Sequence, residues 1–280
     1  EVKRTMCQNI KIPSALTSAV VTRNEQIAAG TWRLVLSVPN WEGEEPAPGQ
    51  FLMLRVSDDS DPLLARPFGI AGFKRSGEAA GMEIIYRVVG RGTRVMGRWK
   101  EGQRAAFLGP LGQGFVLPPE GSTGLLVAGG VGLPPLLSLA RKMETLGRAG
   151  ELSLIYGEAS SDRLADLGKA ISADIQTFTC TEDGSAGTRG LVTDLLEAKD
   201  RGAGRHLFVC GPNAMMKAVS ALTSGQCLSA QYSLEARMAC GFGVCSGCAV
   251  KLASGEYVRV CCEGPVFMGS ELSEESFGEI

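Results

Sequence analysis

The sequence has 280 residues, which at about 150 residues per domain favours two domains. Apolar residues make up 44% and charged residues 21%, so the chain can bury a core and is not expected to be disordered. The 28 basic and 30 acidic residues give a formal charge of −2 without a long basic run, which argues against a nucleic-acid-binding protein.

Residues 14–115 carry the signals of a β-rich domain. Stretches rich in β-branched and large apolar side chains, often alternating with polar ones, occur at 31–38, 50–56 and 82–89. Stretches containing proline and glycine, at 42–49 and 74–81, are expected to separate them as loops. Short strands with turns between them predict a small antiparallel β-barrel.

Residues 120–225 alternate between strand and helix signals. Buried strands are expected at 124–128, 151–156, 175–179 and 207–210, because these runs are short and apolar. Helices are expected from Leu133 to Met143 and at about 162–171, 190–199 and 213–223. This alternation predicts a doubly wound parallel α/β sheet, followed by a small third segment at 226–268.

The nine cysteines indicate a reducing, cytoplasmic compartment, since residues 1–20 carry no secretory signal. The most apolar window, 123–140, is interrupted by glycines and prolines and is too short to span a membrane. Five of the nine cysteines fall between Cys240 and Cys262, and clustered thiols in such a compartment bind metal or do redox chemistry. The single histidine, His206, excludes a Rieske centre and a two-histidine zinc site.

The strongest motif is the C-x4-C-x2-C spacing of Cys240, Cys245 and Cys248 with a distant fourth thiol. This is the plant-type ligand pattern of a [2Fe–2S] cluster, and the small residues between the thiols let a loop wrap tightly around it. A zinc site is the alternative, although its cysteines usually come as C-x2-C pairs. Spacing alone leaves Cys261 and Cys262 both open as the fourth ligand.

Two further motifs lie at the ends of predicted parallel strands. The run from Val127 to Pro135 places Gly130 and Gly132 between a strand and a helix, as in loops that bind a pyrophosphate, although it also fits a tight turn. Cys210-Gly211-Pro212 follows a later strand, at the edge where open α/β sheets bind ligands.

The barrel region holds a fourth motif, Arg66-Pro67-Phe68-Gly69-Ile70, with Gly90-Arg91-Gly92-Thr93 one strand later. The guanidinium group of arginine matches phosphate geometry, and proline stiffens the adjacent backbone. Taken alone, the two stretches are better explained as a strand-edge arginine and a hairpin turn.

In this order, the four motifs resemble those of the ferredoxin reductase superfamily, and more closely those of the electron-transfer subunit of type B dihydroorotate dehydrogenase. The resemblance covers residues 14–268. Its most specific part runs from Glu235 through Arg237, Met238 and the cysteines to the ending Cys261-Cys262-Glu263-Gly264-Pro265-Val266-Phe267.

The resemblance implies three cofactors and the residues that hold them. FAD would be held by Arg66, Pro67, Phe68, Gly69, Gly90, Gly92 and Thr93. NADH, the electron donor, would bind at Gly130, Gly132 and Pro135, with Cys210, Gly211 and Pro212 near its nicotinamide. The [2Fe–2S] cluster would be held by Cys240, Cys245, Cys248 and Cys261, because the ending aligns Cys262 with a variable position.

The sequence departs from the family pattern at three positions. Gly69 stands where a serine is usual, which removes a hydroxyl expected near the reactive edge of the flavin. Pro134 replaces a small residue in the nucleotide loop, and Glu263 replaces an aspartate.

The function implied is an electron relay from NADH through FAD to the [2Fe–2S] cluster, since a flavin exchanges electrons both in pairs and singly. The implied partner is an FMN-containing catalytic subunit that oxidises dihydroorotate to orotate in pyrimidine biosynthesis, in a heterotetramer. One alternative is the small subunit of an NAD(P)H:ferredoxin oxidoreductase or sulfide dehydrogenase, in which aspartate typically replaces the first cysteine, Cys240 here. The other is a zinc-stabilised module that binds a partner.

The remaining residues of chemical interest have simpler interpretations. Glu158 would favour NADH over NADPH if it faces the ribose, and is otherwise a solvated loop acid. Cys7, Cys180 and Cys227 are interpreted as structural thiols, and His206 as a surface or capping residue.

Overall fold

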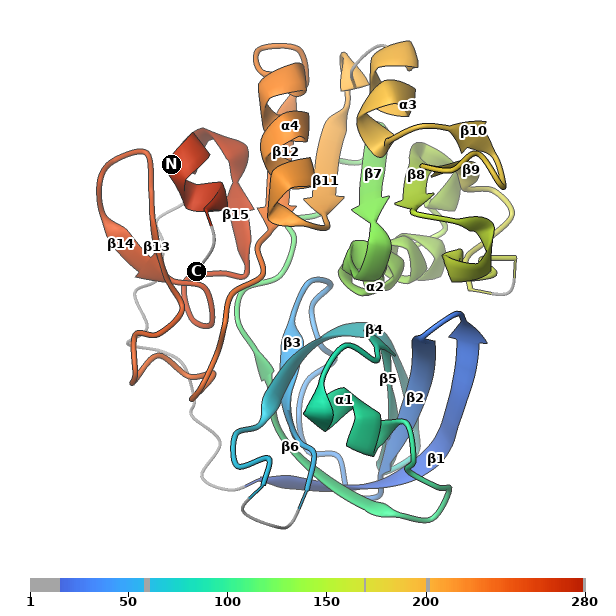
Figure 1. Ribbon diagram of the computed structural model, residues 1–280, viewed down its shortest axis with the longest axis vertical. Coiled ribbons are helices and arrows are strands. Elements are labelled where there is room, and N and C mark those ends of the chain that lie inside the picture. Colours follow the sequence, from blue (N-terminus) through green and yellow to red (C-terminus); the bar gives the residue numbers. More distant parts are fainter. Residues whose placement is uncertain (1–15, 58–60, 169, 200–201, 279–280) are drawn as a thin grey trace.

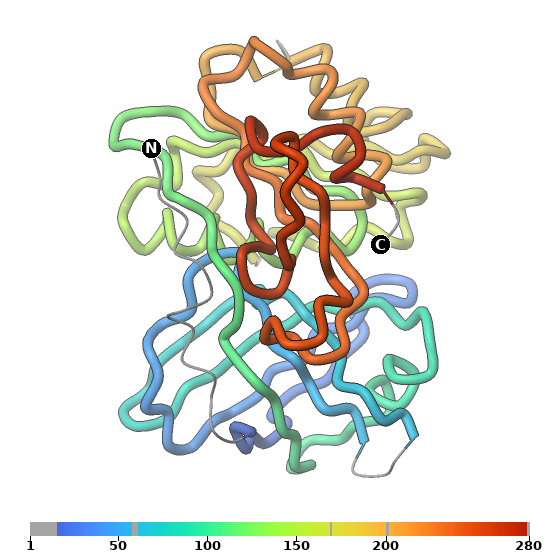
Figure 2. The backbone as a smooth tube through the Cα atoms, turned by 90° about the vertical axis from the view of Figure 1, so that its left-hand side faces the viewer, coloured from blue at the N-terminus to red at the C-terminus, as the bar shows by residue number. Residues whose placement is uncertain are grey.

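The computed structural model describes residues 16–57, 61–168, 170–199 and 202–278. A β-barrel and an α/β sheet occupy opposite ends of the molecule, and the C-terminal segment runs alongside both (Figures 1 and 2). The predicted fold class, with an antiparallel barrel, a doubly wound parallel domain and a small C-terminal segment, is confirmed. No helix in the described residues is long and apolar enough to cross a membrane.

The barrel is closed by six antiparallel strands in the order β1-β2-β5-β4-β3-β6. Its strands are β1 (Thr17–Ala28), β2 (Thr31–Val38), β3 (Phe51–Arg55), β4 (Arg66–Ser76), β5 (Ala79–Arg87) and β6 (Arg104–Leu111). Alternate residues of β2, including Leu34 and Leu36, point inward and are fully buried, as the period of two predicts. The short helix α1 (Arg91–Met96) follows β5 and places Met96 in the same core.

The loop predicted at 74–81 is wrong, because β4 continues to Ser76 and β5 begins at Ala79. The two strands are joined by a tight turn at Gly77 and Glu78. Gly77 has φ +61°, a conformation that glycine adopts without a steric penalty, so the strands can pair up to the turn.

The α/β domain contains a seven-stranded sheet in the order β10-β9-β8-β7-β11-β12-β15. Its strands are β7 (Gly124–Gly129), β8 (Leu152–Glu158), β9 (Gln176–Thr181), β10 (Thr188–Arg189), β11 (His206–Cys210), β12 (Ser229–Ser233) and β15 (Val266–Met268). All neighbouring pairs are parallel except β12 and β15. The helices are α2 (Leu133–Thr145), α3 (Val192–Ala198) and α4 (Asn213–Thr223).

Helices cover both faces of this sheet. Leu126 and Ala128 of β7 pack in the same core as α2, whereas Leu125 and Val127 point to the opposite face, which is covered by α3 and α4. Continuous apolar runs such as β7 therefore follow from burial on both faces. The chain steps from β7 outward to β8 and β9, and then crosses back to place β11 beside β7. This reversal opens a crevice at the carboxyl ends of β7 and β11.

The helix predicted at about 162–171 is wrong. Only a 3₁₀ turn, η4 (Ser161–Arg163), forms there, and the described residues after it are irregular. The Asp166 carboxylate accepts a hydrogen bond from the Gly168 backbone N–H at 3.0 Å. Such local bonds from aspartate compete with the helical backbone ladder and favour a turn.

The C-terminal segment is tied to both domains. The hairpin of β13 (Ala249–Lys251) and β14 (Tyr257–Arg259) precedes β15, which pairs with β12. The Gln113 backbone N–H, just after β6, donates to the Gly264 carbonyl at 2.5 Å. The remaining 3₁₀ helices are η2 (Gly130–Gly132), η3 (Ala149–Glu151), η6 (Gly269–Glu271) and η7 (Glu274–Phe277).

Candidate cofactor-binding site

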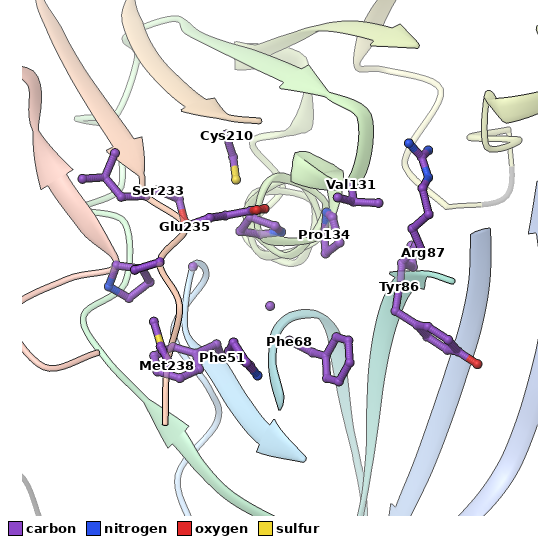
Figure 3. Close-up of a pocket in the computed structure, with 18 of the residues that line it drawn as sticks. Phe51, Phe68, Tyr86, Arg87, Val131, Pro134, Cys210, Ser233, Glu235 and Met238 are labelled. Atoms are coloured by element: carbon purple, nitrogen blue, oxygen red, sulfur yellow. The ribbon is translucent and has the colours of Figure 1, made fainter. Parts of the chain in front are cut away.

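A cavity of about 260 Å³ lies between the barrel and the carboxyl ends of the parallel strands. Its walls come from the barrel, the loop after β7, the end of β11 and the chain after β12, as Figure 3 shows. Six of the thirteen residues predicted to bind FAD or NADH line it: Pro67, Phe68, Gly69, Thr93, Pro135 and Cys210. The fold therefore brings the barrel motif and both strand-end motifs to one place.

A second cavity of about 250 Å³ is lined by the other residues predicted to hold FAD, namely Arg66, Gly90 and Gly92. Pro67, Phe68 and Thr93 border both cavities, so the two adjoin. A Cβ placed on Gly92 would lie 3.4 Å from Arg66 Nε, which brings the two barrel motifs into contact. The hairpin turn considered for residues 90–93 is replaced by the start of α1.

The Thr93 side chain contributes to this site by forming hydrogen bonds with the backbone of the preceding turn. Its hydroxyl oxygen accepts hydrogen bonds from the backbone N–H groups of Val89 at 3.0 Å and Gly90 at 3.1 Å. The same hydroxyl lies 3.1 Å from the Gly90 carbonyl, to which it can donate. Thr93 therefore fixes the shape of the turn around Gly90 and Gly92.

The nucleotide loop and the Cys210-Gly211-Pro212 motif touch each other. Ala128 of β7 is paired with Cys210 of β11, so the loops that follow the two strands start side by side. A Cβ on Gly132 would lie 2.5 Å from the Gly211 amide nitrogen and even closer to the Cys210 carbonyl. Only glycine at position 132 allows this close approach of the two backbones.

The departures from the family pattern at positions 69 and 134 lie next to each other in the cavity wall. A Cβ on Gly69 would lie 3.4 Å from Pro135 Cδ and 3.8 Å from Pro134 Cβ. Glycine and proline together thus form an apolar wall where the family pattern has a hydroxyl and a small residue.

Cys210 and Glu235 are titratable groups that line the cavity (Figure 3). Burial raises the pKa of the Cys210 thiol, and the nearby Glu235 carboxylate adds to the increase, while the Ser233 hydroxyl and the Gly211 N–H oppose it. Burial also raises the pKa of Glu235, although its carboxylate is accessible from the cavity. Cys210 is therefore a neutral thiol at pH 7.

Several lining residues were not predicted as site residues. Phe51, Tyr86, Arg87, Glu235 and Met238 all border the cavity. The ring of Tyr86 contacts that of Phe68 edge to face, with centroids 5.9 Å apart. The sequence offered a signal for Glu235, because this residue lies in the cysteine motif shortly after a strand end. The other lining residues could be found only from the three-dimensional arrangement.

The predicted cluster ligands come together as two pairs. The Cys240 and Cys245 thiols lie near enough to influence each other's pKa, and so do those of Cys248 and Cys261. In the described part of the chain, no group of three or more His, Cys, Asp or Glu side chains is close enough to hold a single metal ion. Two pairs of thiols fit a two-iron cluster, in which each iron takes two protein ligands.

The loop between the first two thiols favours thiolates. Burial tends to raise the pKa of Cys240, but backbone N–H groups of Cys245, Phe242 and Val244 outweigh it and lower the pKa to about 7. The neighbouring Cys261 thiol lowers the pKa of Cys248 to about 6, and the same interaction raises the pKa of Cys261. Thiolates are the form that binds iron, so Cys240 and Cys248 are the two predicted ligands that the protein favours in that form.

Two close contacts hold this loop in place. Gly241, with φ +78°, lies against Met53 of β3, where a Cβ would come within 2.8 Å of the methionine sulfur. Gly243, with φ +87°, lies against Cys262, where a Cβ would come within 2.5 Å of the thiol sulfur. Cys261 and Cys262 are both buried, with sulfurs 3.9 Å apart, and Cys261 is the one paired with Cys248.

Glu158 differs from one of the two interpretations made from the sequence. It is the last residue of β8 and its side chain is only 3% exposed, so it is not a solvated loop acid. Its carboxylate pairs with the Arg87 guanidinium of the barrel at 2.5 Å and accepts a hydrogen bond from the Tyr156 hydroxyl at 3.1 Å. The ion pair therefore screens the carboxylate from the cavity.

The other residues of chemical interest lie away from the site. His206 begins β11, and its Nδ1 lies 2.8 Å from the Ser229 hydroxyl. Cys180 is buried at the end of β9 and Cys227 is half-buried before β12, whereas Cys7 lies outside the described residues.

Two family models match the chain where the geometry places the sites. A model of the iron–sulfur cluster binding domain of dihydroorotate dehydrogenase B matches residues 235–273, and a model of the oxidoreductase NAD-binding domain matches residues 126–221.

Solved structures show the same architecture. An NADH-dependent reduced ferredoxin-NADP oxidoreductase, studied for flavin-based electron bifurcation, superposes with a TM-score of 0.80 at 26% identity, covering 92% of this chain and 91% of that chain. A ferredoxin NADP+ reductase from Neisseria gonorrhoeae superposes with a TM-score of 0.58 at 16% identity, covering 74% and 92%, which shows the fold alone. The fold and the two models define a ferredoxin-reductase-like oxidoreductase with an NAD-binding domain and an iron–sulfur segment.

Curated relatives identify the family more narrowly. The chain is 35% identical over 255 residues to a protein of Aquifex aeolicus named "Dihydroorotate dehydrogenase B (NAD(+)), electron transfer subunit homolog", covering 91% of this chain and 97% of that one. It is 38% identical over 256 residues to the subunit so named in Lysinibacillus sphaericus, covering 88% and 94%. The chain belongs to the family of electron-transfer subunits of dihydroorotate dehydrogenase B, as the sequence motifs predicted.

Proposed function

We propose that this chain passes electrons from NADH through FAD to a [2Fe–2S] cluster, and from there to an FMN-containing catalytic subunit that oxidises dihydroorotate to orotate in pyrimidine biosynthesis. The observation that carries the proposal is the single cavity on which the barrel, the nucleotide loop and the start of the cluster segment converge. A flavin accepts a hydride and releases single electrons when bound, and the protein supplies binding and orientation.

The barrel residues would hold FAD. Arg66, beside Gly92, presents a guanidinium to the cavity proposed for the pyrophosphate. Phe68 and Gly69 border the cavity proposed for the flavin ring, where Gly69 leaves the space free of a side chain. Thr93 keeps the turn at Gly90 and Gly92 open to the pyrophosphate.

The sheet residues would hold NADH on the opposite wall. The close contact of Gly132 with Cys210 and Gly211 brings the pyrophosphate loop and the proposed nicotinamide position together. Pro134 and Pro135 exclude water from that wall because they offer no N–H group. The neutral Cys210 thiol adds no charge beside a developing positive nicotinamide.

The cluster would be held by Cys240, Cys245, Cys248 and Cys261. Met238 lines the cavity two residues before Cys240, and Gly241 rests on Met53, which follows the cavity residue Phe51 by two positions. The cluster segment therefore contacts the barrel strand that borders the flavin position, which supports electron transfer between the two.

The partner, the assembly and the location belong to the same proposal. The relatives are named electron-transfer subunits, which implies a separate catalytic subunit, and we propose a heterotetramer with it. A cytoplasmic location suits a cluster held by free thiols. The domain limits 14–115, 120–225 and 226–268 remain proposed, with β12 and β15 of the last stretch pairing with the NAD-binding sheet.

The structural similarity to the ferredoxin-NADP oxidoreductase favours a second candidate, a subunit that transfers electrons between NAD(P)H and a ferredoxin. Cys240 in place of the aspartate typical of those subunits, and the higher identity to the dihydroorotate dehydrogenase subunits, make it the weaker candidate.

The experiment is an anaerobic NADH titration of purified protein, with flavin, iron and sulfide assayed and with visible and EPR spectra recorded. We expect one FAD and two irons per chain, bleaching of the flavin and the EPR signal of a reduced [2Fe–2S] cluster. Colourless protein containing zinc would refute the relay. Reduction of a ferredoxin but not of a co-purified dihydroorotate dehydrogenase subunit would favour the second candidate.

A further inference from the structure

The barrel brings an arginine to the edge of the nucleotide loop of the other domain. Arg87 is the last residue of β5, and its side chain extends from the cavity wall toward the sheet (Figure 3). A Cβ placed on Gly130, the first residue of η2, would lie 3.7 Å from Arg87 Nη1. The guanidinium and the loop therefore face each other across the boundary between the two domains.

Two hydrogen bonds fix the direction of this guanidinium. Its Nε donates to the Thr31 hydroxyl at 3.3 Å, and its Nη2 donates to the Glu158 carboxylate at 2.5 Å. Glu158 is itself held by the Tyr156 hydroxyl. Nη1 makes no hydrogen bond to any residue that the structure describes, so its donors remain directed at the loop.

The nucleotide loop lacks the groups that usually hold a pyrophosphate. Residues 129–135 contain no charged side chain. Pro134 and Pro135 also remove two of the first backbone N–H groups of α2, which a helix N-terminus would otherwise offer to phosphate oxygens. A pyrophosphate with two negative charges in this loop therefore needs a cation from elsewhere, and an arginine fork matches its geometry.

We propose that Arg87 binds the pyrophosphate of the dinucleotide through Nη1, and that Glu158 is a positioning residue that holds Arg87 in place. The assignment rests on the proposed binding of NADH to this loop. It makes the nucleotide site a composite of both domains, and it places Glu158 behind the guanidinium instead of on the ribose.

The test measures the Kd of NAD+ and of ADP-ribose for FAD-loaded protein by isothermal titration calorimetry. Arg87→Gln is expected to weaken both ligands about tenfold, because both carry the pyrophosphate, and to leave the flavin and iron contents unchanged. Arg87→Gln leaves the buried Glu158 carboxylate without its partner and so could fail to fold. The double variant Arg87→Gln/Glu158→Gln removes that carboxylate as well and is expected to show the same tenfold loss, which allows the test in either case. The matched control is Arg33→Gln, a barrel arginine paired with Glu83 at 3.0 Å, expected to stay within twofold of wild type.

Each other outcome has a distinct meaning. Wild-type affinity in the double variant, with intact flavin spectra, overturns the role of Arg87 and leaves the proposed function standing. Glu158→Gln alone should also weaken both ligands, because Arg87 loses the carboxylate that holds it, whereas an unchanged Kd in that variant would overturn the positioning role of Glu158. Failure of the wild-type protein to bind either ligand would instead refute the proposed function.

Discussion

The contact between Gly132 and the end of β11 makes a prediction with a calculable magnitude. Gly132 has φ −73°, which alanine adopts freely, so Gly132→Ala adds only a Cβ. That atom would lie 2.5 Å from the Gly211 nitrogen, where an ordinary contact begins at 3.4 Å, so the two backbones must separate by about 0.9 Å.

The size of the effect follows from what obstructs the new atom. Overpacking of a core typically destabilises by about 1–3 kcal/mol, and the obstacles here are backbone atoms of Cys210 and Gly211, which cannot rotate away. We therefore expect a loss near 3 kcal/mol, with no compensation from helix propensity, because Gly132 is the N-cap of α2, where glycine is preferred over alanine. If both domains unfold together, at about 2–4 °C per kcal/mol, this loss lowers the Tm by about 6–12 °C.

The assay is thermal unfolding of the FAD-loaded protein, together with the Kd of NAD+. The displaced loop should weaken NAD+ by at least tenfold, since both strand-end motifs border the nucleotide. Gly150→Ala is the matched control, because Gly150 lies in the same domain and a Cβ there meets nothing within 4 Å. A Gly132→Ala variant with the Tm and the Kd of the Gly150→Ala protein would refute the reasoning.

Three further predictions address the cluster, the flavin and pH. Cys240→Ser should lose iron and the EPR signal yet leave flavin reduction by NADH intact, and Cys227→Ser is the control expected to keep all three. Loss of the flavin in Cys240→Ser would contradict the separation of the two sites. Arg66→Ala should weaken FAD retention at least tenfold, since a hydrogen bond to a charged group contributes about 1.5–3 kcal/mol. Arg94→Ala, at an exposed position of α1, should leave FAD retention unchanged. The flavin-to-protein ratio after gel filtration measures this, and a full ratio for Arg66→Ala argues against its role. Burial raises the pKa of Cys180 to about 11, so the unfolded thiol loses its proton first and the Tm should fall between pH 9 and 11. The fall should be shallower in Cys180→Ala, and an unchanged slope would show that another group titrates.

The elements that were predicted correctly have clear local sequence patterns. The expected strand at 31–38 and helix at 213–223 coincide with β2 and α4, because the first has β-branched residues and buried alternation and the second begins directly after a proline. The predictions at 74–81 and 162–171 failed because a two-residue turn and an aspartate side chain decided the local structure. The spacing of hydrophobic residues carries no information about either of these two features.

Contacts between distant segments could not be predicted in this way. The pairing of Arg87 with Glu158 joins residues 71 positions apart on two different sheets, and nothing in either local sequence indicates the other. The same holds for Gly69 and Pro135, which lie next to each other in the cavity wall. The sequence identified Gly69 and Pro134 as notable residues, but only the packing of α2 against β4 brings them together.

Chain connectivity also limits the distance between the cavity and the cysteine loop. Cys210 and Ser233 end neighbouring parallel strands, β11 and β12, and both line the cavity. Cys240 follows Ser233 by seven residues, and seven residues span at most about 25 Å when fully extended. The first predicted cluster ligand therefore cannot lie farther than that from Ser233, which lines the cavity proposed for the nicotinamide. The contact of Gly241 with Met53 places the cysteine loop against β3, the barrel strand that also contains Phe51. Because β12 leads directly into the cysteine loop, the three proposed cofactor sites come together.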